Sequence, residues 1–154
     1  MKYVTRVLQP GESVVYATSY HWLVYLRAVV LLLIAVAALI GSQMVNNTDL
    51  RLGLYAVAAI FVLFAFGSWL HALIRRVTTE LAITDRRVIY KTGLLRRHTI
   101  EINRSKVETV GVNQSILGRL LGFGTIIVRG TGGSFEPIPF IAEPLTFRNH
   151  ITAG

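Results

Sequence analysis

Two long apolar segments dominate the pattern of hydrophobic and polar positions along this chain. Residues 22–45 carry one charge, Arg27, near their start, and residues 52–74 carry no Asp, Glu, Lys or Arg. Each segment has about 23 residues, which as a helix is long enough to cross a hydrocarbon core roughly 30 Å thick. A backbone in lipid must satisfy its own hydrogen bonds, so both segments are predicted to be membrane-spanning helices joined by the polar residues 46–51.

Positive charges flank this predicted hairpin on both sides. Lys2 and Arg6 precede the first apolar segment. Arg75 and Arg76 follow the second directly, whereas the connecting loop has no net charge. Short basic flanks stay on the cytoplasmic side of a membrane, so both termini are predicted to be cytoplasmic in a multi-pass protein.

Beyond Arg76 the pattern changes to short alternating segments bounded by turn residues, which is typical of antiparallel strands. Ser115 and Gly122 bracket a short helix, and Pro144 fits the first position of a closing helix that ends at Ile151. The predicted fold is an α+β membrane protein: a two-helix transmembrane hairpin, then a small antiparallel β barrel or sandwich with a short C-terminal helix. The strands are expected at residues 79–84, 87–91, 97–102, 108–113, 125–129 and 134–138.

Residues 1–21 contain a Pro-Gly turn and then a short strand pattern at 13–18. Such a strand needs a partner, and the predicted sheet beyond residue 74 is the available one. We therefore expect three parts: a cytoplasmic segment 1–21 that packs on the C-terminal domain, the hairpin 22–74, and the domain 75–154. The pattern leaves open whether the first strand joins the sheet or only covers it.

The charge of the chain favours an anionic surface as its partner. The net charge is +8, and the region from Arg75 onward contributes +6 of it, with 12 Lys/Arg against 6 Asp/Glu. A domain tethered to a bilayer meets anionic headgroups first, so membrane lipid is favoured over nucleic acid. Topology determination by Arg75 and Arg76 is a simpler explanation of those charges and is compatible with lipid attraction, and a merely solvated surface is the favoured interpretation of Arg96 and Arg97. The candidate lipid or partner contacts are Arg75, Arg76, Lys91, Arg96 and Arg97.

The residues give no sign of a catalytic, metal or cofactor site. The chain has no cysteine, and its four histidines are scattered without ligand spacing. The glycine-rich residues 122–124 and 130–133 lack the Lys-Ser/Thr ending of a phosphate-binding loop and are interpreted as turns. The chain is therefore expected not to be an enzyme. Arg86 is expected to pair with Asp85 or Glu80 and so to hold its hairpin turn.

The order of motifs resembles the bacterial pleckstrin-homology-like membrane protein family, formerly a domain of unknown function. The matching pieces are residues 8–12 with 21–22, residues 83–90 leading to Gly93, residues 114–125 and residues 130–133. The resemblance implies a pleckstrin-homology (PH)-like fold, a bent barrel closed at one end by the final helix, in the bacterial inner membrane. The turn residues that would define this fold are Thr84, Asp85, Arg86, Gly93, Gly122 and Gly124.

The function expected from these features is a non-enzymatic, membrane-anchored binding or scaffolding module at the cytoplasmic face of the inner membrane. Its partners would be membrane lipid and either another protein or further copies of itself, in an envelope-associated role and without nucleic acid. The alternative is an accessory subunit of a membrane transport or envelope-stress system that acts through its transmembrane helices.

Overall fold

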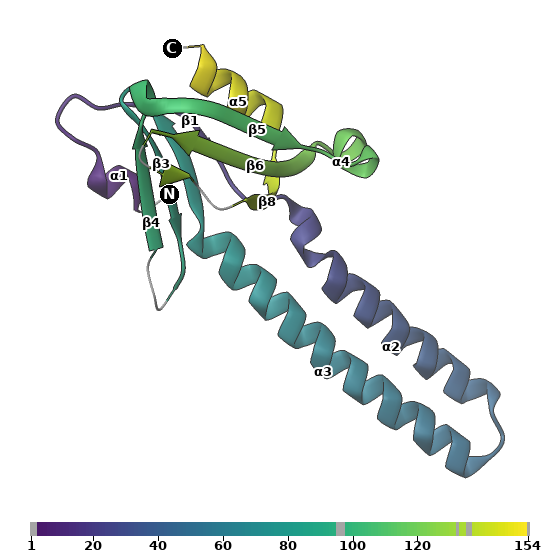
Figure 1. Cartoon of the computed structure of the whole chain (residues 1–154). Helices are drawn as coiled ribbons and strands as arrows, with labels where there is room; N and C mark the ends of the chain where they lie inside the picture. Colours follow the sequence, from purple (N-terminus) through teal and green to yellow (C-terminus); the bar gives the residue numbers. More distant parts are fainter. Residues whose placement is uncertain (1–2, 95–97, 132, 135–136, 154) are drawn as a thin grey trace. The chain divides into compact units, whose positions relative to one another are not determined.

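The computed structural model describes residues 3–94, 98–131, 133–134 and 137–153 (Figure 1). The chain forms two compact units. One is the helical hairpin Trp22–Ile74, and the other combines Met1–His21 with Arg75–Gly154. The folded unit is thus built from two pieces of chain that the hairpin separates in sequence.

The hairpin consists of a 3-10 turn, η1 (Trp22–Tyr25), that continues into α2 (Leu26–Met44), followed by α3 (Thr48–Thr78). α3 begins earlier than predicted, because the Asn47 Oδ1 accepts a hydrogen bond from the Leu50 N–H at 3.1 Å and caps the helix. Residues 48–51, predicted to lie in the loop, are therefore the first turn of α3. The loop shortens to three residues.

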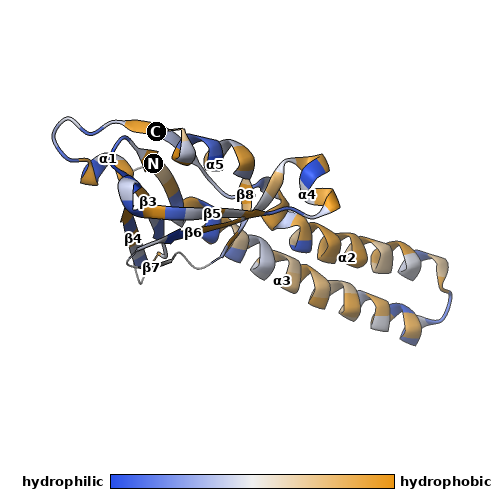
Figure 2. Ribbon diagram, turned by 45° about the horizontal axis from the view of Figure 1, so that its top comes forward, coloured by the Kyte–Doolittle hydropathy of each residue, from blue (hydrophilic) through white to orange (hydrophobic). Residues whose placement is uncertain are grey.

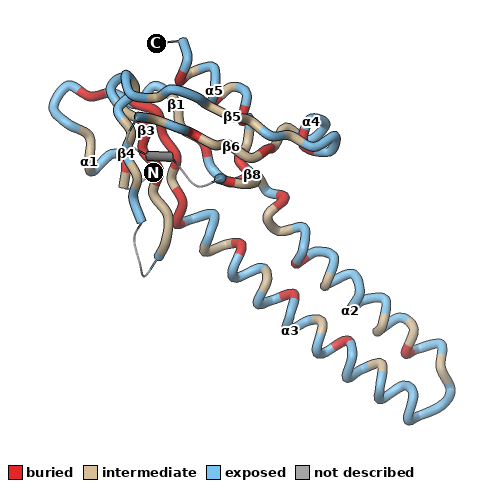
Figure 3. Tube along the Cα trace, in the orientation of Figure 1, coloured by how far each residue is buried: buried red, intermediate tan, exposed pale blue. Residues whose placement is uncertain are grey.

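In α2, and in α3 as far as Ile74, small residues occupy the buried positions at a spacing of seven. They are Ala28, Ala35 and Ser42 in α2, and Ala58, Ala65 and Ala72 in α3. Most other residues of these helices are apolar (Figure 2), and many of them are exposed (Figure 3). Gly53 and Gly67 of α3 have no neighbour within 4 Å of an added Cβ. By length and composition, both helical segments could cross a membrane.

The strands of the folded unit form two antiparallel sheets. The first has the order β1-β2-β3-β4; in the second, β5, β6 and β7 are neighbours and β8 also pairs with β6. Their bounds are β1 (Val14–Thr18), β2 (Glu80–Thr84), β3 (Arg87–Thr92), β4 (His98–Asn103), β5 (Val107–Asn113), β6 (Phe123–Gly130), β7 (Gly133–Ser134) and β8 (Ile138–Ala142).

The sheets do not close into the expected barrel. Within the described residues one bridge, Tyr20 to Ile141, links the two sheets on one side. On the other side the chain passes from β4 to β5 through a 3-10 turn, η2 (Arg104–Lys106), and the two strands belong to different sheets. The structure is therefore α+β with two separate sheets. The chain passes from the first sheet to the second at η2.

β1 joins the first sheet as an edge strand, which answers the question that the sequence left open. It pairs antiparallel with β2, with Thr18 opposite Leu81. A short helix, α1 (Val4–Val7), which the sequence pattern did not predict, brings Val4 against Ala82 and Ile89 in a small buried cluster. β2 is consequently buried on both faces.

The main core lies between the sheets and is closed at one end by α5 (Pro144–Thr152), which packs against β1, β5 and β6 (Figure 1). Phe147 and Ile151 are buried, as their four-residue spacing predicted. The Arg104 guanidinium donates hydrogen bonds to the carbonyls of His150 and Ile151 and so caps the end of α5. The fully buried strand side chains include Leu81, Ile83, Val88, Ile126, Val128, Ile138 and Ile141.

The last strands differ from the prediction. A strand was expected at 134–138 with Pro139 as its breaker, but β8 runs through Pro139. β8 pairs with β6, but Pro139 has no partner in this ladder, which is irregular opposite it, between Gly124 and Ile126. A proline costs little there because its missing N–H has no ladder bond to make. Residues 135–136 of the expected strand lie outside the described residues.

The short helix α4 (Ile116–Leu121) begins after Ser115 and ends before Gly122, which confirms the prediction. The Ser115 hydroxyl accepts a hydrogen bond from the Gly118 N–H at 3.0 Å, and Gly122 follows the helix with a φ of 74°. Gly124, interpreted as a turn residue, lies inside β6 instead. An added Cβ at Gly124 would lie 2.7 Å from the Gln114 Cγ and 2.9 Å from the Asn113 carbonyl oxygen.

Substituting Gly124→Ala is therefore expected to destabilise the protein by about 2 kcal/mol, the usual range for an overpacked site. Thermal unfolding of the full chain in detergent, followed by circular dichroism, should show a lower Tm. Gly111→Ala is the matched control, because Gly111 lies on the neighbouring strand β5 and an added Cβ there meets its nearest atom at 3.7 Å. Equal Tm values for the two variants would contradict the packing described here.

Candidate functional site

A basic groove lies beside the end of α3. Its volume is about 690 Å³, and its walls come from α1, the end of β1, the end of α3, β2 and β3. Three cationic side chains line it: Arg6 of α1, Arg76 of α3 and Lys91 of β3. Residues that are far apart in sequence thus bring positive charge to one hollow of the folded unit.

Hydrogen bonds within the groove hold its walls in place. The Glu80 carboxylate accepts hydrogen bonds from the backbone N–H groups of Tyr3 and Val4 at 3.0–3.1 Å, which fixes the start of α1. Burial alone would raise the pKa of Glu80, but these two hydrogen bonds and the Lys91 charge lower it below the usual value. Glu80 is therefore ionised at neutral pH and already bonded to the backbone.

Lys91 keeps hydrogen-bonding capacity for a ligand. Its Nζ donates to the Thr78 carbonyl at 2.8 Å. An ammonium group has three N–H donors, so this bond orients the side chain without using all of them. With Arg6, Arg76 and Lys91 against Glu80, the groove has a net positive charge suited to phosphate or carboxylate oxygens.

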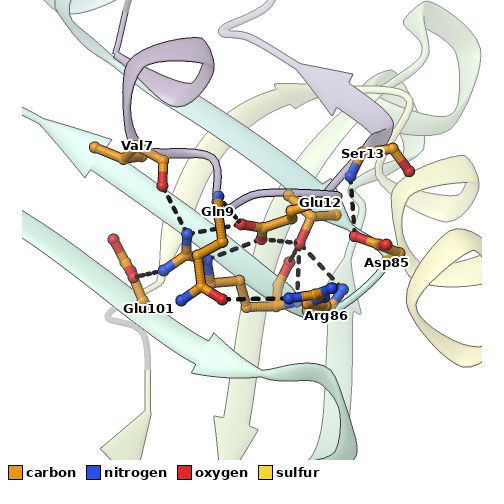
Figure 4. Close-up of polar contacts among 9 residues, drawn as sticks. Val7, Gln9, Glu12, Ser13, Asp85, Arg86 and Glu101 are labelled. Carbon is orange, nitrogen blue, oxygen red and sulfur yellow. Dashed lines mark hydrogen bonds and ion pairs between the residues drawn. The ribbon is translucent and has the colours of Figure 1, made fainter.

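A second polar cluster, centred on Arg87, joins the N-terminal segment to the first sheet (Figure 4). The Arg87 guanidinium contacts the Glu12 carboxylate through two hydrogen bonds of 2.8 and 2.9 Å and the Glu101 carboxylate at 2.6 Å. It also donates to the Val7 carbonyl at 2.8 Å. The Glu12 side chain is fully buried in this cluster.

The environment of Glu12 stabilises its charged form. Burial by itself would raise its pKa, but hydrogen bonds from Arg87, the Gln9 N–H and the Thr84 hydroxyl, with the Arg87 charge, lower the pKa from 4.5 to about 2. The Thr84 Oγ1 lies 2.7 Å from the Glu12 Oε1 and accepts the Arg87 N–H at 2.9 Å. The charged groups of this cluster find their hydrogen-bond partners within it, so we assign the cluster a structural role.

The turn between β2 and β3 is held by the same segment. Asp85 accepts a hydrogen bond from the Ser13 N–H at 3.1 Å, and its own N–H donates to the Ser13 carbonyl. Gly93 ends β3 with a φ of 92°, a conformation that favours glycine. Thr84, Asp85 and Arg86 are thus each bonded to a residue of the N-terminal segment.

A family model described as "Bacterial PH domain" matches residues 15–153, through both units. The chain belongs to the bacterial PH domain family. No curated protein and no solved structure gives a significant match. PH-like domains are generally non-catalytic binding modules, and the family supports a binding or scaffold role for this chain.

The structure of this bacterial PH domain brings two of the five predicted contact residues together. Arg76 and Lys91 line the basic groove. Arg75 is exposed, is not among the groove residues, and acts electrostatically on Tyr90. Arg96 and Arg97 lie outside the described residues. The structure adds Arg6, whose part in the groove depends on the unpredicted helix α1.

The expected pairing of Arg86 with Asp85 or Glu80 is wrong. The Arg86 Nη1 lies 3.5 Å from the Gln9 side-chain oxygen, while Asp85 and Glu80 accept backbone N–H groups. The neighbouring Arg87 makes the ion pairs instead. Strand alternation explains this, because Arg87 shares the outer face of the sheet with Ile89 and Glu101, where the N-terminal segment packs.

Removing the Glu12 charge is expected to destabilise the bacterial PH domain by about 3 kcal/mol at neutral pH, because Arg87 then loses its buried partner. Glu12→Gln keeps the size of the side chain, and Glu108→Gln removes an exposed carboxylate on β5 as a control. The Tm of the full chain in detergent should fall for the first variant alone.

The Tm difference between wild type and Glu12→Gln should also depend on pH. The pKa of Glu12 is depressed in the folded state, so its stabilisation is present above 4.5 and is lost as the pH falls toward about 2. The two Tm values should therefore converge over that range. A Tm difference that stays constant with pH would show that the loss is not due to the charge.

Proposed function

We propose that this bacterial PH domain is a non-enzymatic binding module fixed to the cytoplasmic face of the inner membrane by its hairpin, and that its basic groove binds anionic lipid headgroups. The single observation that carries the proposal is the position of the groove. Arg76 lines it and lies two residues beyond the second apolar segment. A groove that begins where a chain leaves the bilayer is within reach of headgroups.

Membrane anchoring is supported by the distribution of side chains in the hairpin. The buried positions of α2, and of α3 as far as Ile74, are alanine and serine, while large apolar side chains such as Leu33, Leu63 and Phe64 are more than 60% exposed. A water-soluble helix pair would bury its large apolar side chains and expose polar ones. In lipid the reverse is stable, since small residues form the helix–helix contact and apolar ones face the acyl chains.

The cytoplasmic orientation is supported by charge. Arg6 before the hairpin and Arg75 and Arg76 after it are the basic residues that remain on the cytoplasmic side during insertion. Anionic lipids of the cytoplasmic leaflet attract each nearby cation by about 1 kcal/mol. The same arginines thus serve both topology and headgroup binding.

A second candidate function is an accessory membrane subunit that acts through the hairpin. It is favoured by a small apolar groove of about 290 Å³ on the hairpin, lined by residues such as Tyr25, Ala28, Phe66 and Trp69. Such a groove suits a further apolar helix. Under this alternative the basic groove has no lipid role, so the lipid measurement separates the two candidates.

The proposal predicts that charge in the groove sets the affinity for anionic lipid. The full chain in detergent would be titrated with phosphatidylglycerol, with bound lipid counted by native mass spectrometry and phosphatidylcholine as the zwitterionic comparison. The double variant Arg6→Gln, Lys91→Gln loses about 2 kcal/mol of attraction, so its Kd for phosphatidylglycerol should rise about thirtyfold.

A matched double variant, Lys106→Gln with Arg129→Gln, removes the same charge from exposed positions outside the groove. Its affinity should stay close to that of the wild type. An equal loss in both double variants would mean that net charge alone attracts lipid, and no preference for phosphatidylglycerol would exclude the headgroup site.

A further inference from the structure

The helix α4 presents four large apolar side chains to solvent. Ile116 is 87% exposed, Leu117 63%, Leu120 79% and Leu121 40%. At roughly 100° per residue, these four positions occupy one continuous arc of about 140° around the helix. Such a concentrated apolar face on a soluble surface marks a contact with a partner or a membrane.

The helix is held firmly enough to present this face. Gly118, on the opposite side of α4, is buried against β6, where an added Cβ would lie 2.7 Å from the Phe123 carbonyl oxygen. The Gln114 side-chain amide donates hydrogen bonds to the carbonyls of Gly118 and Phe123 at 3.3 and 3.0 Å. Both ends of α4 are therefore fixed, and the apolar face points away from the sheet.

α4 lies beside the point where the chain leaves the folded unit. His21 is the last residue before the hairpin, and its N–H donates to the Phe140 carbonyl at 2.6 Å. Its ring stacks on Phe123 with the ring centroids 5.5 Å apart, and the ring is hydrogen-bonded to the backbone of Leu121. The end of α4 thus contacts the residue from which the first apolar segment starts.

The surroundings of the apolar face fit the boundary of a bilayer. Arg119 is the exposed cation of α4 itself, and Phe140, 41% exposed, stacks on Phe123. Apolar side chains flanked by an arginine and an aromatic ring are typical of helices that lie in the headgroup region. A stable protein interface needs about 20–30 residues on each side, far more than this face provides.

We propose that α4 inserts Ile116, Leu117 and Leu120 into the interfacial region of the bilayer that the hairpin spans. The contact would be a second membrane attachment, separate from the headgroup groove. This inference rests on the proposed membrane anchoring, because α4 can reach a bilayer only if the hairpin crosses one.

The absence of native cysteine allows the depth of single positions to be measured in the full chain. Leu120→Cys would be labelled with the fluorophore NBD and reconstituted in vesicles of phosphatidylcholine and phosphatidylglycerol. The phosphatidylcholine would be brominated near the headgroup end of its acyl chains to quench NBD. Leu63→Cys on the exposed face of α3, measured with bromine deeper in the chain, reports whether the hairpin is inserted.

Val15→Cys is the matched control, because Val15 is also an exposed apolar residue of the folded unit. It lies at the start of β1, whose first residue pairs with Thr84 at the β2–β3 turn, away from His21. We expect NBD at residue 120 to emit at shorter wavelength and to lose most of its fluorescence to the brominated lipid. NBD at residue 15 should keep a water-like emission and remain unquenched.

The outcomes separate this inference from the proposed function. Quenching at residue 63 with water-like, unquenched emission at residue 120 would overturn the insertion of α4 and leave the anchored hairpin intact. A short-wavelength emission at residue 120 that lipid does not quench would mean that a second copy of the chain covers the helix, which also overturns it. Unquenched fluorescence at residue 63 would overturn the membrane anchoring and this inference together.

Discussion

The antiparallel pairing of β1 with β2 is the constraint on which the rest of the structure depends. These two strands flank the hairpin in sequence, and Thr18 lies opposite Leu81 within one sheet. Because the two pieces of chain are neighbours in the same sheet, the hairpin must leave and rejoin the folded unit on the same side. Under the proposed anchoring, this topology requires an even number of membrane crossings and places both pieces of the folded unit on one side of the membrane.

The pairing is reinforced by charge at the far end of the strands. Arg87 on β3 holds Glu12 and the Val7 carbonyl of the N-terminal segment, and Asp85 holds the Ser13 N–H (Figure 4). At the other end, Glu80 binds the start of α1. The N-terminal segment is therefore an integral part of the domain, and the same contacts that hold α1 carry Arg6 to the basic groove.

Local signals in the sequence were enough to predict α2 to α5 and most strands. Ser115 and Gly122 predicted the two ends of α4, and Pro144 predicted the start of α5. The alternation of polar and apolar residues predicted β2, β3 and β5. The predictions failed where contacts between residues far apart in sequence determine the local structure. Arg87 rather than Arg86 makes the ion pairs because of the face that the N-terminal segment covers. β8 tolerates Pro139 because the β6–β8 ladder is irregular there and gives that residue no partner. The position of Arg6 in the groove depends on α1, and a helix of four residues carries too little local signal to be predicted from the sequence.

We propose that the hairpin crosses the membrane and returns, so that its loop and the folded unit lie on opposite sides. Single cysteines at Asn46, in the loop between α2 and α3, and at Thr152, at the exposed end of α5, would be treated with a membrane-impermeant maleimide in intact spheroplasts and again after lysis. We expect Asn46→Cys to react in intact spheroplasts and Thr152→Cys to react only after lysis. Reaction of both cysteines from the same side of an intact membrane would contradict it.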